Sequence, residues 1–95
     1  MFKISIVETP SQRRLILEGK LISPWTAEVA TAWKNAADDL QGRKLVVDLT
    51  NVTLISADGE ETLFELMRSG ANFLCGDVLT KHVVKKLARK HHCKV

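Results

Sequence analysis

The sequence predicts a small α/β domain, with a mixed β-sheet and helices packed against it in the order β-β-α-β-α-β-α. Two observations support this fold class. An alternating apolar segment, a turn and a second apolar segment open the chain, as in a β-hairpin. Segments of helical period then alternate with short β-branched runs, which predicts parallel strands joined by right-handed crossovers. With 95 residues, we expect one domain spanning 1–95.

The opening hairpin is predicted from its period. Residues 2–7 alternate between apolar and polar side chains, as in a half-buried strand. Residues 9–12, Thr-Pro-Ser-Gln, form a turn signal, and residues 13–18 read as the second strand. Two short strands across a tight turn are expected to pair antiparallel.

A first helix is expected to begin at Ser23-Pro24, with Ser23 as the N-cap and Pro24 at the first helical position. Gln41-Gly42 is expected to end it. Its apolar stripe comprises Trp25, Val29, Ala32, Trp33, Ala36, Ala37 and Leu40. Trp25 lies in the first turn, so its ring either joins the core or is presented for recognition.

The middle of the chain predicts a buried strand followed by a second helix. Residues 44–49 form a β-branched run without clean alternation, which is typical of a strand covered on both faces. Asp58 is expected to cap the second helix, with Glu61 three residues on as in a capping box. Ser69-Gly70 is the predicted end of this helix.

The last elements are a short strand at 72–75, a turn and cap at Gly76-Asp77, and a third helix running to about Lys90. The charge is unevenly placed. Residues 77–95 carry six Lys or Arg against one Asp, whereas residues 1–76 carry eight against ten Asp or Glu. We expect the basic helix to present a solvated face, with no nucleic-acid partner.

Cysteine usage and hydropathy predict a reducing, cytoplasmic compartment. Cys75 and Cys93 do not form a close pair, and Lys3 and Glu8 interrupt the apolar stretch at the N-terminus, so no signal peptide is expected. No apolar run has the length needed to cross a bilayer, so no membrane insertion is expected.

No catalytic, cofactor-binding or metal-binding set is predicted. The chain has neither a Gly-rich phosphate loop nor a Gly-x-Ser-x-Gly elbow. His82 and the run His91-His92-Cys93 are expected to be polar residues of the basic helix, because adjacent residues rarely face one ion together. Cys75 is expected to be a small core residue. The chain is therefore expected not to be an enzyme.

The most informative segment is Asp48–Ala71, where a buried strand ends, a short loop turns and a helix begins with unpaired amides. Loops of this kind are where α/β folds place their sites. Phe64 falls slightly off the core stripe of the helix. It either widens that stripe or contacts a partner.

This segment resembles the STAS domain family, named for sulfate transporters and anti-sigma factor antagonists. The family pattern is a strand ending in Asp-Leu-Ser/Thr, then Val-x-Phe-Ile-Asp-Ser-Ser-Gly, then a helix with Leu spacing and a Gly-Ala stop. The matching residues are Asp48–Thr50, Val52–Ile55, Ser56–Gly59, Leu63, Leu66 and Gly70-Ala71, with Leu17, Gly19 and Leu21 upstream. The resemblance implies a STAS-like fold over nearly the whole chain, without the final strand and helix of longer members.

The resemblance also implies where the chain departs from the family. In anti-sigma antagonists, a partner kinase phosphorylates the first Ser of Asp-Ser-Ser-Gly, and the matching residue here is Ala57, which has no hydroxyl. Ser56 replaces the preceding Asp, and Asp58 replaces the second Ser. Phosphorylation at the family position is therefore chemically impossible, while Ser56, one residue away, remains open to modification.

The resemblance implies a non-catalytic protein-interaction module whose partner is an anti-sigma-type kinase or a related regulatory complex. Two alternatives stay open: a cytoplasmic STAS subunit of a bacterial ABC system that moves phospholipids, and a domain that binds a nucleotide or small anion at the helix start. Genomic neighbours and thermal stability with nucleotide would discriminate between them. The predicted partner-binding residues are Ser23, Pro24, Trp25, Ser56, Ala57, Asp58, Gly59, Glu60, Glu61 and Phe64.

Overall fold

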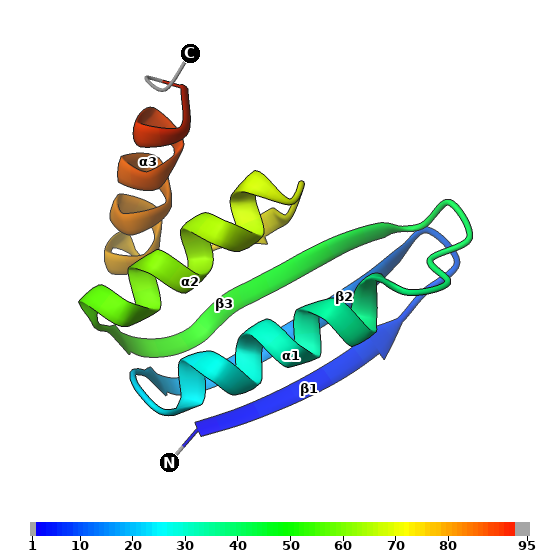
Figure 1. Ribbon diagram of the computed structural model, residues 1–95, viewed down its shortest axis with the longest axis horizontal. Coiled ribbons are helices and arrows are strands. Elements are labelled where there is room, and N and C mark those ends of the chain that lie inside the picture. Colours follow the sequence, from blue (N-terminus) through cyan, green and yellow to red (C-terminus); the bar gives the residue numbers. More distant parts are fainter. Residues whose placement is uncertain (1, 93–95) are drawn as a thin grey trace.

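The structure of the protein, a computed structural model, describes residues 2–92 except for the side chains at positions 79 and 90–92. Its elements follow the predicted order β-β-α-β-α-β-α (Figure 1). In chain order they are β1 (Phe2–Glu8), β2 (Gln12–Leu21), α1 (Trp25–Ala37), β3 (Lys44–Ile55), α2 (Ala57–Arg68), β4 (Asn72–Leu74) and α3 (Val78–His92).

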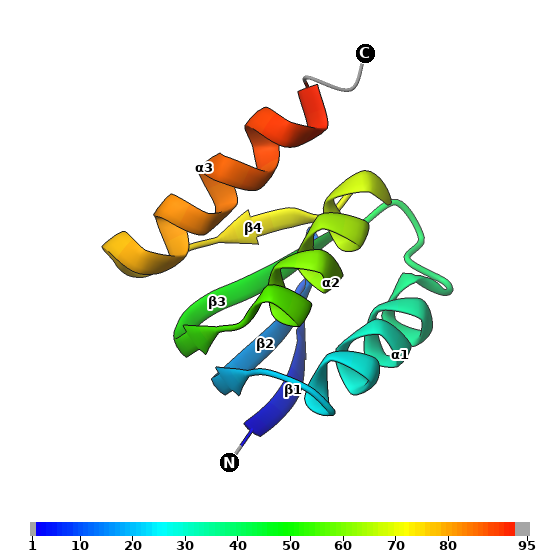
Figure 2. The same ribbon diagram turned by 60° about the vertical axis from the view of Figure 1, so that its left-hand side comes forward.

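The four strands form one mixed sheet in the spatial order β1-β2-β3-β4. β1 pairs antiparallel with β2, whereas β2–β3 and β3–β4 are parallel, as the sequence predicts. The order follows from the connections, because a tight turn joins β1 to β2 and a helix joins each parallel pair (Figure 2). β1 and β4 are therefore the two edges of the sheet.

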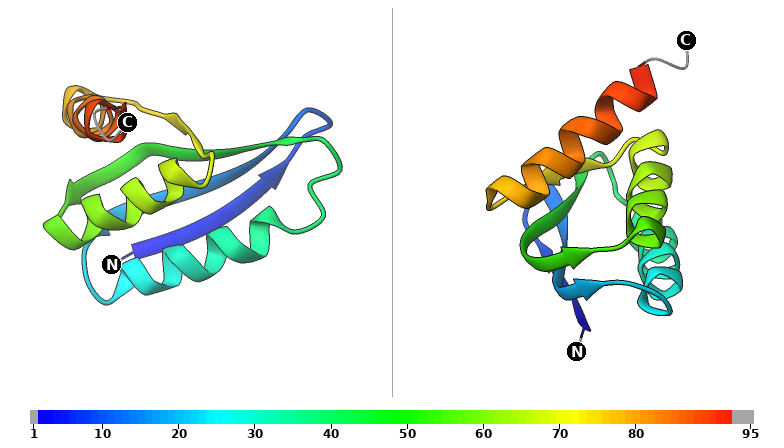
Figure 3. Two further views of the ribbon diagram at one scale, coloured as in Figure 1. Left: turned by 45° about the horizontal axis from the view of Figure 1, so that its top comes forward. Right: turned by 90° about the vertical axis from the view of Figure 1, so that its left-hand side faces the viewer.

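The helices cover the sheet unequally. α1 and α2 lie side by side on one face, while α3 crosses the β4 edge and packs against α2 and β3 (Figure 3, right). Alternate residues of β2 and β3 point toward α1 and α2 and have no solvent exposure, among them Leu15, Leu17 and Val47. Val83 and Leu87 bring α3 into the same core.

Both central strands are longer than predicted. β2 continues beyond residue 18 to Leu21, and β3 continues beyond residue 49 to Ile55. The polar residues Thr50 and Asn51 do not end β3, because irregularities in the β2–β3 pairing shift the register there and the ladder resumes. Carried on to Leu21 and Ile55, the two strands end side by side.

Both predicted ends of α1 are wrong. The helix begins at Trp25 with Pro24 in the cap position, and Ser23 caps nothing. The Pro24 carbonyl accepts the Ala27 N–H, so backbone atoms close the first turn and Ser23 lies too early to reach it. The helix ends at Ala37, before the predicted Gln41-Gly42.

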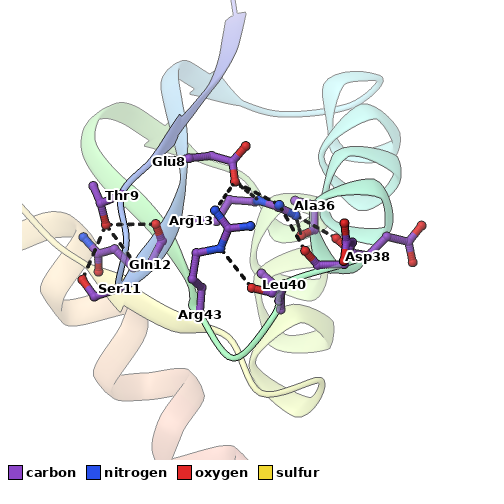
Figure 4. A network of polar contacts seen from close by, with 10 residues as sticks. Glu8, Thr9, Ser11, Gln12, Arg13, Ala36, Asp38, Leu40 and Arg43 are labelled. Carbon is purple, nitrogen blue, oxygen red and sulfur yellow. Dashed lines mark hydrogen bonds and ion pairs between the residues drawn. The ribbon is translucent and has the colours of Figure 1, made fainter.

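The early end of α1 is explained by a polar network at the amino ends of β2 and β3 (Figure 4). The Arg13 guanidinium donates to the carbonyls of Ala36 (2.6 Å) and Asp38 (2.8 Å), which the helix leaves unpaired. The same guanidinium pairs with Glu8 at 3.0 Å, and Arg43 reaches the same carboxylate at 2.7 Å. These three side chains, Glu8, Arg13 and Arg43, are called the amino-end network below.

The predicted signals at the end of α2 and at the start of α3 are confirmed. α2 ends at Arg68, and Gly70 takes a positive φ of 97° just beyond it. The Asp77 carboxylate accepts hydrogen bonds from the Thr80 N–H and hydroxyl at the start of α3, both at 2.9 Å. These bonds hold the pKa of Asp77 below its ordinary value.

Candidate partner-binding site

Two of the predicted loops meet at one end of the sheet. Because β2 and β3 are parallel, their carboxyl ends lie at the same edge, and Ser23–Trp25 and Ser56–Gly59 follow them. Figure 1 shows both strand exits beside the first turns of α1 and α2. We call these two segments the carboxyl rim.

Ser56 organises the rim and is the N-cap of α2, in place of the predicted Asp58. Its backbone is extended, and its hydroxyl accepts the Gly59 N–H at 3.1 Å. The Ser56 N–H and hydroxyl both donate to the Leu21 carbonyl, at 3.1 and 3.3 Å. The helix thus begins at Ala57, which places Asp58 inside the first turn and leaves it exposed. The Ser56 hydroxyl is engaged in the fold, which disfavours its modification.

Gly59 is required by close packing between α2 and the end of β2. A Cβ atom at this position would lie 2.5 Å from the Leu21 carbonyl oxygen and 3.1 Å from the Ile55 side chain. The Gly in the sequence motif is therefore explained by the approach of two backbones. This role depends on a contact between residues 21 and 59, which no local sequence signal indicates.

The acidic residues of α2 border a groove between α2 and α3. The groove has a volume of about 410 Å³. It is lined by Ala57, Glu60, Glu61, Phe64, Glu65 and Arg68 of α2 and by Leu87 of α3. An ion pair of 2.8 Å between Glu60 and Lys86 bridges the two helices. Four of the predicted binding residues, Ala57, Glu60, Glu61 and Phe64, thus share one concave surface.

Phe64 fulfils both roles that the sequence left open. Its side chain is half-buried and packs against the core, and it also lines the groove. The Arg68 guanidinium lies 5.9 Å from the centre of its ring, a cation–π distance. Arg68, Glu65 and Leu87 are groove residues that the sequence prediction missed. Glu65 and Arg68 could have been found from their spacing, one turn after Glu61 and Phe64 on the same helical stripe.

Trp25 has a packing role. Its ring stacks on Phe2, with centroids 6.4 Å apart and planes at 17°. This contact ties the start of α1 to the start of β1 and leaves the ring half-buried. Ser23 and Pro24 are exposed on the rim beside it. α1 and α3 both contact α2, on opposite sides, so Trp25 does not reach the groove (Figure 3, right).

The electrostatics at the start of α2 favour a cationic or neutral partner over an anion. Asp58 and Glu60 lie in the first turn, where acids stabilise the helix dipole. With Glu61 they surround the N–H groups that a phosphate would need. Ala57 is exposed and has no hydroxyl. This arrangement disfavours the nucleotide-binding or anion-binding alternative.

Among the side chains that the structure describes, no three His, Cys, Asp or Glu lie close enough to hold a metal ion. The side chains of His91, His92 and Cys93, predicted not to bind a metal, lie outside the described residues. Cys75 is half-buried beside Thr80, and burial raises the pKa of its thiol. No helix in the described part of the chain is long and apolar enough to cross a bilayer.

Comparison with known proteins identifies the fold. No protein-family profile and no curated protein sequence matches the chain. Among solved structures, it is similar to an antisigma-factor antagonist STAS domain from Rhodobacter sphaeroides, with 18% identity and a TM-score of 0.55 over 79% of this chain and 86% of that one. It is also similar to Mglu, with 19% identity and a TM-score of 0.60 over 77% of this chain but only 19% of that one. The chain has a STAS-like fold.

Proposed function

We propose that this chain is a non-catalytic protein-interaction module whose partner docks on the carboxyl rim and the adjoining α2–α3 groove. One observation carries the proposal. Ala57, Glu60, Glu61 and Phe64, selected from the sequence, line a single groove that holds two acids, of which Glu61 is exposed, and an aromatic ring. Aromatic and charged groups around a concave surface are typical of protein-binding sites.

The fold supports a regulatory partner. The similar domain from Rhodobacter sphaeroides is described as an antisigma-factor antagonist, and a partner of that class, an anti-sigma-type kinase, fits a STAS-like chain. Ala57 occupies the position of the phosphorylated Ser, and the Ser56 hydroxyl is held between Leu21 and Gly59. We therefore propose constitutive binding in the cytoplasm, which does not respond to ATP.

The test is a pull-down from native lysate that compares the wild type with two site variants. Phe64→Ala removes the ring from the groove, and Ala57→Glu adds a charge at its rim. Ser11→Glu is the matched control, because it adds the same charge at an exposed position in the β1–β2 turn, at the amino end of β2. Thermal denaturation of each variant checks that it is folded.

The proposal predicts one partner that the wild type and Ser11→Glu retain equally, with or without ATP. Ala57→Glu and Phe64→Ala are expected to lose it. Retention of every partner by both folded site variants would place the interface elsewhere. Recovery of ABC-transporter components in place of a kinase would assign the chain to the transport alternative.

A further inference from the structure

The side of α3 that faces away from the core is basic. Its exposed side chains lie within an arc of about 100° around the helix axis and are those of Val78, Lys81, His82, Lys85 and Arg89. The buried Val83 and Leu87 lie on the opposite side of the helix. α3 is at the margin of the molecule, and none of the other described elements lies beyond this exposed side (Figure 2; Figure 3). We call it the outer face of α3.

The cations of the outer face are not neutralised within the fold. Among the side chains that the structure describes, Lys81, Lys85 and Arg89 make no ion pair. Lys86, on the flank of the helix, differs from them because it pairs with Glu60 at 2.8 Å and joins α3 to α2. The first turn of α3 carries no acidic residue. The outer face therefore presents three positive charges to the solvent.

The spacing of these cations works against the helix. Lys81, Lys85 and Arg89 are four residues apart, so they lie above one another on successive turns. Like charges at this spacing destabilise a helix, because the side chains repel each other. A local arrangement that costs stability and contributes no packing is typical of a functional surface. The row of cations thus indicates an anionic partner.

The outer face also carries an exposed aliphatic side chain. Val78 is 83% exposed, nearly twice the exposure of Leu54 on β3, at 46%. It borders a hollow of about 240 Å³ that Lys81, His82 and Lys85 also line. An aliphatic group and two ammonium groups are therefore next to one another on one surface.

This combination fits an anionic lipid bilayer better than a nucleic acid. Ammonium groups pair with lipid phosphates and carboxylates, while an adjacent aliphatic side chain reaches the boundary of the acyl chains. On a nucleic-acid backbone, Val78 would contact only sugar and phosphate. The described outer face also has no Asn or Gln to read base edges and no Phe or Trp on which bases stack.

The distribution of charge along the chain favours one orientation at such a surface. Acids outnumber bases in residues 1–76, and bases outnumber acids in residues 77–95. A negatively charged bilayer therefore attracts α3 and repels the remainder of the domain.

We infer that the outer face of α3 binds the surface of an anionic phospholipid bilayer. The attachment is peripheral, because the apolar side of α3, with Val83 and Leu87, is packed in the core and is not free to insert. Leu87 also lines the α2–α3 groove, on the side of α3 opposite Lys85, so the groove stays open to a partner. The inference goes beyond the proposed function, because it assigns a second surface and a different class of ligand.

The test is sedimentation of the purified full chain with lipid vesicles. Vesicles of phosphatidylcholine and phosphatidylserine in equal parts are compared with vesicles of phosphatidylcholine alone. Binding to the mixed vesicles only is expected, and it is expected to weaken as the salt concentration rises. Equal binding to both kinds of vesicle, or no binding to either, would overturn the inference.

Charge variants locate the binding surface. Lys81→Ala and Lys85→Ala are each expected to weaken binding to the mixed vesicles about fivefold, and Lys81→Glu/Lys85→Glu is expected to abolish it. Lys34→Glu/Lys44→Glu is the matched control, because it makes the same change in charge at exposed positions of α1 and β3. Circular dichroism establishes that the variants are folded. Equal losses in the two double variants would place the binding surface elsewhere and overturn the inference.

The aliphatic contact distinguishes a bilayer from a nucleic acid. Val78→Thr keeps the shape of the side chain and is expected to weaken vesicle binding about fourfold. Val7→Thr, at a 46% exposed position of β1, is expected to have no effect. Binding to duplex DNA in place of the mixed vesicles, at the same salt concentration, would overturn the inference. These measurements involve no partner protein and are independent of the pull-down.

Discussion

The two ends of the sheet use charged residues in opposite ways. At the amino ends of β2 and β3, Glu8, Arg13 and Arg43 pair with one another and with backbone carbonyls. At the carboxyl ends, Asp58 and Glu61 are exposed near the start of α2. Charges satisfied within the chain stabilise the fold, whereas charges presented beside a groove are available to a partner. The comparison separates a structural end from a binding end, and the predictions below test that separation.

The largest stability effect is expected from Gly59→Ala. The new methyl group would meet the Leu21 carbonyl oxygen at 2.5 Å, so α2 has to shift from the end of β2. We expect a loss of about 3 kcal/mol in the free energy of unfolding, measured by urea denaturation. Ala57→Ser, an exposed change two residues away, is expected to stay within about 0.5 kcal/mol. Equal urea midpoints for Gly59→Ala and Ala57→Ser would show that the close approach of Gly59 to the Leu21 carbonyl does not contribute to stability.

At the opposite end, Arg13→Ala is expected to cost about 2 kcal/mol. It removes the donor shared by Glu8 and by two carbonyls at the end of α1, and the Arg13 side chain is only 11% exposed. Arg13→Lys is expected to recover less than half of the loss, because one ammonium group cannot span these acceptors. Lys20→Ala, at an exposed position of the same strand, is the control. A fully stable Arg13→Lys variant would mean that charge alone matters here.

A smaller effect on stability is expected at the start of α2, where two variants distinguish Ser56 from Asp58 as the N-cap. Ser56→Ala is expected to destabilise the protein by about 1 kcal/mol, because the Gly59 N–H loses its acceptor. Asp58→Ala is expected to change stability by less than about 0.5 kcal/mol, because Asp58 only adds charge near the helix dipole. Denaturation midpoints in the reverse order would restore Asp58 as the cap.

The smallest effect is a pH dependence that arises outside the binding end. Hydrogen bonds from Arg13 lower the pKa of Glu8 from its ordinary 4.5, and bonds from Thr80 lower that of Asp77 from 3.8. Each carboxylate therefore contributes stability that is complete above these ordinary values and is lost as the pH falls through the lower folded-state pKa. Urea midpoints from pH 7 to pH 2 are expected to fall below about pH 4.5, less steeply in Glu8→Gln. If the urea midpoint of Glu8→Gln fell with pH in parallel with that of the wild type, Glu8 would not contribute to the pH dependence of stability.

Sequence periodicity was sufficient for the order of elements and the pairing of strands, because the alternation at 2–7 and the apolar run at 44–49 reflect burial directly. Periodicity was insufficient at helix ends whose position depends on a residue far away in the sequence. The end of α1 depends on Arg13, more than twenty residues earlier, and the cap of α2 depends on the Leu21 carbonyl that positions Ser56. Of the groove, Ala57, Glu60, Glu61 and Phe64 were selected from the sequence, because the motif marks the start of the helix. Glu65 and Arg68 were missed, although their helical spacing indicates them. Leu87 could not be predicted, because its place depends on how α3 packs against α2.

The most direct test of the division between the two ends is the affinity of the captured partner for Ala57→Glu and Ser11→Glu, measured by the same titration. Both variants add one negative charge at an exposed position and both are expected to fold like the wild type. The account predicts at least about tenfold weaker binding for Ala57→Glu and an unchanged affinity for Ser11→Glu. Equal affinities for the two variants, or a loss confined to Ser11→Glu, would contradict it.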